Sequence, residues 1–82
     1  MITVKFFGLI SVDYNIRQIL VKEGSVKQAL EEIRKNCPHI PEQHLMKALL
    51  FVNKQHLSGN KRFSVILKDG DELALINPSS GG

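Results

Sequence analysis

The chain has 82 residues and a mass of 9.2 kDa, the size of one domain with a thin core. Its 43% hydrophobic and 23% charged residues exclude a disordered chain, its apolar runs are far shorter than the roughly 18 residues of a membrane span, and its one cysteine excludes a disulfide framework. The net charge of +3 is mild and spread along the sequence. With no signal-peptide pattern at the start, we expect a cytoplasmic protein that binds neither nucleic acid nor membrane.

Two strands are predicted near the start of the chain. Residues 2–7, Ile-Thr-Val-Lys-Phe-Phe, alternate between two faces, which indicates a strand with one buried face. Residues 14–22 are less regular, since Ile16, Ile19 and Leu20 also fit helical spacing. Their β-branched side chains and polar flanks favour a second strand.

A helix is predicted to begin after Ser25. Ser25 and Gln28 form a capping box, in which each side chain satisfies an otherwise unpaired backbone N–H of the other residue. Apolar residues then recur in one stripe at helical spacing from Val26 to Cys37, and Pro38 ends the segment. One side of this helix must therefore lie on a sheet.

The second half of the chain is predicted to consist of strands and loops. Residues 38–44 are expected to form a loop because they contain two prolines. The continuous apolar run in 47–57 is typical of a central strand covered on both faces. Residues 63–67 alternate as a short strand or covering segment, Asp69-Gly70 indicates a turn, and 72–76 is the final strand.

This order of elements predicts an α+β fold, with a mixed sheet and one main helix packed across one face. In one such arrangement the first and last strands pair in the middle of the sheet. Residues 77–82, Asn-Pro-Ser-Ser-Gly-Gly, cannot contribute appreciably to a core, and Pro78 cannot extend a sheet internally. We therefore predict a domain at 1–76 and a flexible C-terminal tail at 77–82.

The end of this tail points to a chemical role. Gly81 and Gly82 leave the main-chain carboxylate with no side chain beside it, so that a narrow enzyme channel can admit it. An ionised carboxylate is a poor electrophile and needs activation, for instance as an acyl phosphate ester, before a nucleophile can attack it. The alternative interpretation is a frayed terminus or a cloning artefact.

Three stretches carry a resemblance to a known family. They are 2–8, Ile-Thr-Val-Lys-Phe-Phe-Gly; 23–26, Glu-Gly-Ser-Val; and 69–82, which combines Asp-Gly-Asp-Glu, an apolar strand, a proline and a terminal Gly-Gly. Over essentially its whole length the sequence resembles the MoaD/ThiS family of ubiquitin-like sulfur carriers, which have a β-grasp fold. Phe6-Phe7 and the chain length look more like the small subunit of molybdopterin synthase than the thiamine-pathway carrier.

The resemblance implies a sulfur carrier that is not catalytic alone and binds no cofactor. An E1-like adenylating enzyme would use ATP to activate the Gly82 carboxylate, and a persulfide donor would convert it into a thiocarboxylate. The carrier would then dock on the large, MoaE-like subunit of molybdopterin synthase, where Gly81 lets the tail thread into the active site, and give sulfur to a cyclic pterin precursor. The alternatives are a thiamine-type sulfur carrier, a protein modifier conjugated through Gly82, and a passive interaction module.

The strand alternation predicts a docking patch independently of the resemblance. The side chains expected to face the helix are Ile2, Val4, Phe6, Leu73 and Leu75. The opposite face then presents apolar side chains near the tail, and such exposed patches often mark interfaces. The alternative is that the 58–68 segment covers them as a second small cluster. The expected partner contacts are Phe7, Ala74, Ile76, Pro78, Ser79 and Ser80.

The remaining candidate groups are given ordinary structural roles. Cys37 lies on the apolar stripe of the helix, which indicates a buried thiol rather than a sulfur relay. His39, His44 and His56 form no short helical ligand pair, so we expect no metal site.

Overall fold

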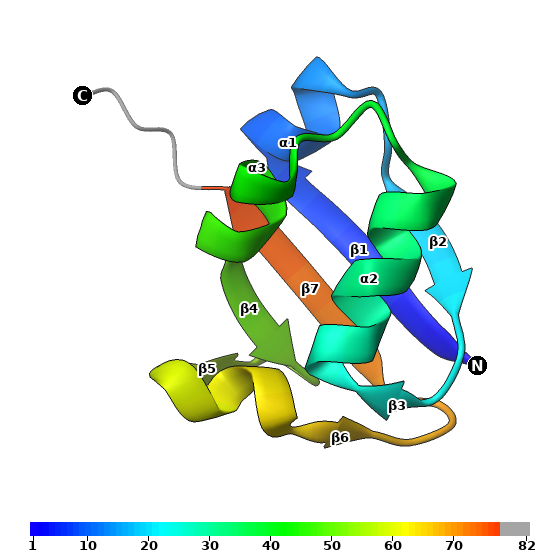
Figure 1. Ribbon diagram of the computed structural model, residues 1–82, viewed down its shortest axis with the longest axis vertical. Helices are drawn as coiled ribbons and strands as arrows, with labels where there is room; N and C mark the ends of the chain where they lie inside the picture. The colour runs from blue at the N-terminus through cyan, green and yellow to red at the C-terminus, as the bar shows by residue number, and fades with distance from the viewer. Residues whose placement is uncertain (78–82) are drawn as a thin grey trace.

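The computed structural model describes residues 1–77. Its main sheet contains five strands of this part of the chain, in the order β2-β1-β7-β4-β5 (Figure 1). They are β1 (Ile2–Gly8), β2 (Gln18–Val21), β4 (Leu49–Val52), β5 (Gln55–Leu57) and β7 (Glu72–Asn77). β1 and β7 are parallel, and the other neighbours are antiparallel. The prediction that the first and last strands pair in the middle is confirmed.

One main helix, α2 (Val26–Asn36), packs across one face of this sheet, as predicted (Figure 1). Two shorter helices, α1 (Leu9–Asp13) and α3 (Glu42–Lys47), lie at the end of the sheet where β7 ends. A 3₁₀-helix, η1 (Asn60–Ser64), precedes β6 (Ile66–Leu67), which pairs with β3 (Gly24–Ser25) as a separate two-stranded sheet. No helix within residues 1–77 has the length and apolar character needed to cross a membrane.

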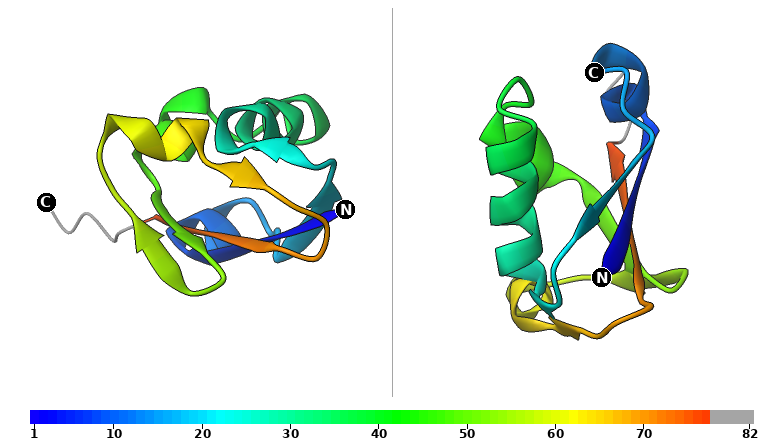
Figure 2. Two further views of the ribbon diagram at one scale, coloured as in Figure 1. Left: turned by 90° about the horizontal axis from the view of Figure 1, so that it is seen from below. Right: turned by 90° about the vertical axis from the view of Figure 1, so that its right-hand side faces the viewer.

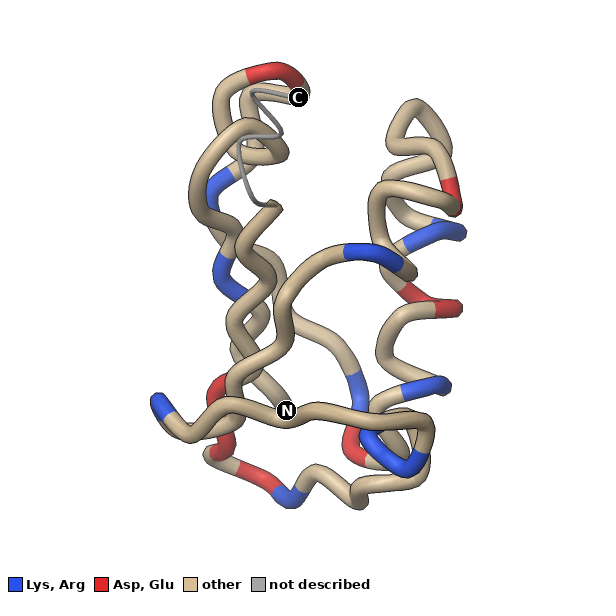
Figure 3. Tube along the Cα trace, turned by 90° about the vertical axis from the view of Figure 1, so that its left-hand side faces the viewer, with Lys and Arg blue, Asp and Glu red and all other residues tan. Residues whose placement is uncertain are grey.

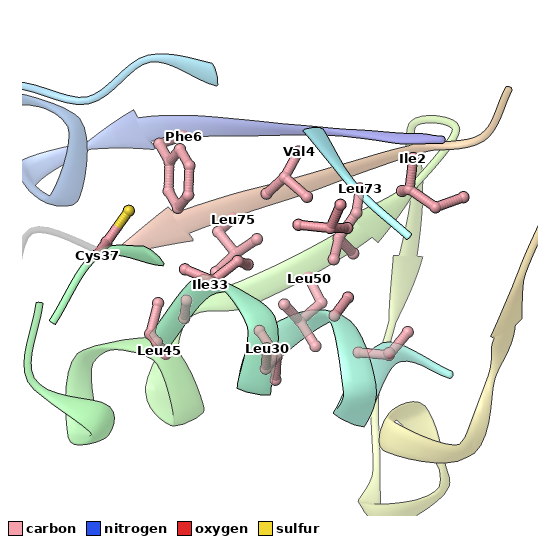
Figure 4. Close-up of a cluster of buried hydrophobic side chains, with 14 of the residues drawn as sticks. Ile2, Val4, Phe6, Leu30, Ile33, Cys37, Leu45, Leu50, Leu73 and Leu75 are labelled. Carbon is pink, nitrogen blue, oxygen red and sulfur yellow. The ribbon is translucent and has the colours of Figure 1, made fainter. Parts of the chain in front are cut away.

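The core lies between α2 and the main sheet (Figure 4). The five strand residues predicted to face the helix are at most 3% exposed, and α2 contributes Val26, Ala29, Leu30 and Ile33 from its apolar stripe. Each fully buried aliphatic side chain contributes about 1.5–3 kcal/mol relative to exposure. Burial of these two facing sets fixes the helix on the sheet.

The start of α2 has the predicted capping box. The Oγ of Ser25 accepts a hydrogen bond of 3.1 Å from the backbone N–H of Gln28, and the Oε1 of Gln28 accepts one of 2.9 Å from the backbone N–H of Ser25. Two N–H groups that the first turn leaves without helical partners are satisfied in this way.

The prediction of a loop at 38–44 is wrong in its second half, because α3 begins at Glu42. Pro41 is the residue before the helix and has a φ of −60°, which suits a helix start and does not break it. Leu45 is buried against the core, so tertiary packing stabilises a helix whose sequence carries little periodic signal.

Two further segments differ from prediction. The second strand covers only Gln18–Val21, because α1 follows β1 directly and buries Ile10. η1 covers the first two residues of the short strand predicted at 63–67, and only Ile66–Leu67 is strand. These elements are too short for the period of their side chains to identify them.

Candidate functional site

The base of the predicted tail lies at the end of the central strand. β7 runs between β1 and β4 and includes Asn77, which pairs with Gly8 at the last register position. The residue expected to open the tail therefore belongs to the sheet. The other tail residues with expected roles lie outside the described residues: Pro78, Ser79, Ser80, Gly81 and Gly82.

Four residues from distant segments meet at this position, and we call them the tail root: Gly8, Tyr14, His44 and Asn77. A Cβ atom on Gly8, whose φ is +74°, would lie 2.9 Å from the carbonyl oxygen of Asn77. The side-chain amide of Asn77 donates to the carbonyl oxygen of His44 at 3.5 Å, the long limit of a hydrogen bond. The Tyr14 hydroxyl and the His44 Nδ1 are 2.7 Å apart.

The outer face of the sheet, away from α2, carries the three predicted docking residues of the domain. Phe7 is directly opposite Ile76 in the parallel ladder, and its side chain is 45% exposed. Ala74 is on the same face but only 7% exposed, because it is small and lies between Lys5 and Phe51 on the neighbouring strands.

Two further apolar residues on this face were missed by the sequence analysis. Leu49, which is 40% exposed, pairs with Ile76, and the half-buried Phe51 pairs with Ala74. The apolar run in 47–57 predicted a strand covered on both faces, which is wrong for the outer face, where Leu49 is 40% exposed, and nothing in the run marked the side of these two residues. We call this surface the outer-face patch, and its members are Phe7, Leu49, Phe51, Ala74 and Ile76.

The alternative that the 58–68 segment covers this face is wrong. Phe63 and Val65 pack against the main core, and η1 contacts α2 on the helical side of the sheet (Figure 2). Within residues 1–77 no helix or strand lies over the outer-face patch, which therefore presents apolar side chains to solvent.

Charges border the outer-face patch without entering it. The ammonium of Lys5 and the carboxylate of Glu72 form an ion pair of 3.1 Å, and the ring of His56 lies 5.1 Å from that of Phe51. Over the described residues, basic and acidic positions are interspersed along the backbone (Figure 3).

The described part of the chain contains no reactive thiol at its surface and no cluster of metal-binding side chains. Cys37 is 5% exposed and its side chain points into the core (Figure 4). The predicted buried cysteine is confirmed by this exposure, and burial raises the pKa of its thiol. Residues 1–77 contain no group of three or more His, Cys, Asp or Glu side chains that could hold a metal ion.

A groove of about 460 Å³ lies among α2, α3 and η1, on the helical side of the molecule. Leu30, Leu45, Met46 and Phe63 line it together with charged side chains. It is on the opposite side of the core from the outer-face patch, so it is not part of the predicted site.

The family of the chain follows from a comparison with protein-family models. A model described as the ThiS family matches residues 11–82. The chain belongs to the ThiS family. This is a family of ubiquitin-like sulfur carriers, and the matched residues include the whole of β7 and the terminal Gly-Gly. None of the curated proteins matches the chain.

Solved structures confirm the β-grasp fold of this ThiS-family chain. Small archaeal modifier protein 1 from Methanosarcina acetivorans is 18% identical with a TM-score of 0.81, over 99% of this chain and 95% of that one. A chain in the complex of subunits 1 and 2 of the Helicobacter pylori molybdopterin-converting factor is 22% identical with a TM-score of 0.62, over 99% and 97%. A chain in the Amycolatopsis orientalis BexX/CysO complex is 20% identical with a TM-score of 0.71, over the full length of both.

Proposed function

We propose that this chain carries sulfur as a thiocarboxylate on Gly82 and donates it as the small subunit of a molybdopterin synthase. The observation that carries the proposal is that the ThiS-family match extends through Gly81 and Gly82. The central strand of the fold ends only five residues before Gly82. A rigid domain thus immediately precedes the group that would react.

The chemistry needs two steps at the Gly82 carboxylate. A carboxylate oxygen attacks the α-phosphorus of ATP and displaces pyrophosphate, which gives an acyl-adenylate on an E1-like adenylating enzyme. The terminal sulfur of a persulfide then attacks the acyl carbon and displaces AMP, and a thiol reductant cleaves the resulting acyl disulfide to release the thiocarboxylate. ATP, the persulfide and the thiol reductant are co-substrates, the partner enzymes supply the catalytic groups, and the carrier supplies the carboxylate and a docking surface.

The outer-face patch is the proposed docking surface. It is apolar, its β7 members Ala74 and Ile76 lie three residues and one residue before the end of β7, and the other elements of residues 1–77 leave it open. Apolar surfaces of this kind often mark protein interfaces. Pro78, Ser79 and Ser80 would then lie along the partner's entrance, and Gly81 would let the last residues enter a narrow channel.

The molybdopterin pathway is supported by the Helicobacter pylori neighbour, which is a complex of subunits 1 and 2 of a molybdopterin-converting factor. By analogy, the partner of this chain would be a large synthase subunit that receives the tail. A second candidate is a protein modifier conjugated to lysines through Gly82, since one neighbour is a small archaeal modifier protein. A thiamine-type sulfur carrier is the third candidate, because the matching family model is that of ThiS.

Mass spectrometry of the intact chain tests the carrier proposal. After incubation with an E1-like adenylating enzyme, ATP and a persulfide donor, we expect the mass increase of one oxygen-to-sulfur exchange at Gly82. A chain with one extra alanine after Gly82 is the matched control and is expected to stay unchanged. An unaltered mass in both chains contradicts the proposal.

The same preparation separates the pathways. The thiocarboxylated chain is mixed with a large molybdopterin synthase subunit and the cyclic pterin precursor. If this chain is the small synthase subunit, it is expected to lose its thiocarboxylate sulfur and regenerate the carboxylate on Gly82. Loss of sulfur only to a thiazole synthase favours the thiamine pathway. Covalent ladders on lysines of other proteins favour the modifier.

A further inference from the structure

β1 ends beside the last residue of β7 at a position that has no room for a Cβ atom. Gly8 is the last residue of β1 and pairs with Asn77, the last residue of β7. Its φ is positive, and a Cβ atom added to it would lie only 2.9 Å from the Asn77 carbonyl oxygen, so there is room only for glycine. The two strand ends therefore approach each other more closely than any side chain at position 8 permits.

On the opposite side of Asn77, a long hydrogen bond of 3.5 Å and a short one of 2.7 Å form a chain of polar groups. The Asn77 amide donates a hydrogen bond to the backbone carbonyl of His44 in α3. The His44 imidazole is hydrogen-bonded to the hydroxyl of Tyr14, the C-terminal cap residue of α1. The ring of His39 packs edge-on against that of Tyr14 at 5.8 Å. Helices as short as α1 and α3 are not stable alone, so these contacts tie both helices to the strand end.

We propose that the tail root, Gly8, Tyr14, His44 and Asn77, is a positioning device that sets the point from which the reactive tail leaves the domain. This inference rests on the proposed function of Gly82. Five residues after Asn77 span at most about 18 Å, so the position that the Gly82 carboxylate can reach in a docked enzyme depends on where that span begins.

Docking and the positioning of the tail are then the tasks of two separate surfaces. The outer-face patch supplies docking, and the tail root, directly beside Phe7 and Ile76, supplies the starting position of the tail. Displacing a reacting group by about 1 Å can cost up to about 100-fold in rate. Loosening the tail root is therefore expected to lower kcat for the carrier and to leave its KM unchanged.

The test measures ATP–pyrophosphate exchange by an adenylating enzyme that accepts the unaltered chain, with the carrier as varied substrate. Gly8→Ala is expected to lower kcat about tenfold, with KM changed by less than about twofold. Gly59→Ala is the matched control, because Gly59 has a similar φ of +81° but nothing within 4 Å of its Cβ position. It bears similar backbone strain and is expected to keep both constants.

Asn77→Asp and Tyr14→Phe test the polar chain with nearly unchanged shape. Each removes one hydrogen-bonding group and is expected to lower kcat about threefold. The double variant is expected to lose less than the product of the two single losses, since both act through His44. These variants also keep the test decisive if Gly8→Ala does not fold.

The outcomes distinguish this inference from the proposed function. An unaltered chain that adenylating enzymes do not accept overturns both. An accepted chain whose Gly8→Ala and Asn77→Asp variants keep the kcat of Gly59→Ala overturns the positioning role alone. A rise in KM at constant kcat also overturns it, because the tail root would then belong to the docking surface.

Discussion

At the scale of single residues, Asp71 explains why the Asp-Gly-Asp-Glu stretch stands before the last strand. Its carboxylate accepts hydrogen bonds from the backbone N–H of Lys68 at 2.8 Å and from the side-chain amide of Asn53 at 3.0 Å. The Oδ1 of Asn53 in turn accepts from the backbone N–H of Glu72 at 3.0 Å. This network joins the turn before β7 to the turn between β4 and β5, so it sets where the central strand begins.

The Asp71 network predicts a loss of stability in acid. The N–H of Lys68 and then the amide of Asn53 hold the pKa of Asp71 below its ordinary value of 3.8. A lowered pKa in the folded state stabilises the fold above the unfolded-state pKa, and this contribution is lost as the pH falls through the lower, folded-state value. In urea titrations at about pH 6 and about pH 3, Asp71→Asn is expected to show a smaller fall in the free energy of unfolding than the unaltered chain.

The reference for this experiment is the same carboxyl in the unfolded chain. NMR titration of Asp71 is expected to give a lower midpoint in the native protein than in urea. A native midpoint at or above 3.8 would contradict the role of the two hydrogen bonds.

At the scale of elements, α2 is the one whose start is most directly encoded. The capping box and the apolar stripe are both local patterns, and both are present in the fold. Ser25→Ala is expected to lower the free energy of unfolding by about 1 kcal/mol, because the N–H of Gln28 loses its acceptor. Urea unfolding at neutral pH measures this change.

Ser58→Ala is the matched control for the cap. Ser58 is exposed in the turn between β5 and η1, and exposed substitutions of this kind change stability by less than about 0.5 kcal/mol. Ser25→Thr is expected to restore most of the lost stability, since it keeps the hydroxyl. Equal losses for Ser25→Ala and Ser58→Ala would rule out the capping role.

Local pattern also decides which elements the sequence predicted and which it did not. β1, α2 and β7 are long enough for their periods to be clear, and the alternation in β1 and β7 correctly separated the core-facing side chains from Phe7 and Ile76. α3 was missed because its burial depends on one side chain, Leu45. Its stability comes from contacts with distant segments, which no local period shows.

At the scale of the whole molecule, the candidate site is formed by segments that are far apart in the sequence. The outer-face patch draws on β1, β4 and β7, and only its β1 and β7 members could be predicted from alternation. The tail root brings Tyr14 and His44, 30 positions apart, into contact. No spacing rule links such residues, so that part of the site follows only from the packing of α1 and α3 against the strand ends.

If the outer-face patch serves docking and the tail root positions the tail, a change in the patch alters the affinity for a partner enzyme. Phe7→Ser removes a large, exposed aromatic side chain beside Ile76 and leaves the core unchanged. Buried aromatic anchors contribute much of the binding energy of protein interfaces. The Kd for an adenylating enzyme that accepts the unaltered chain is therefore expected to rise at least about tenfold, or about 1.4 kcal/mol, in isothermal titration calorimetry.

Leu20→Ser supplies the control on the same face of the sheet. Leu20 is 53% exposed and pairs with Thr3, about 13 Å along β1 from Phe7. It lies on the edge strand β2, outside the outer-face patch. Its substitution is expected to leave the Kd unchanged, and both variants are expected to unfold at the temperature of the unaltered chain. If Leu20→Ser weakens binding as much as Phe7→Ser, docking uses the whole outer face and the patch around the end of β7 has no special part in it.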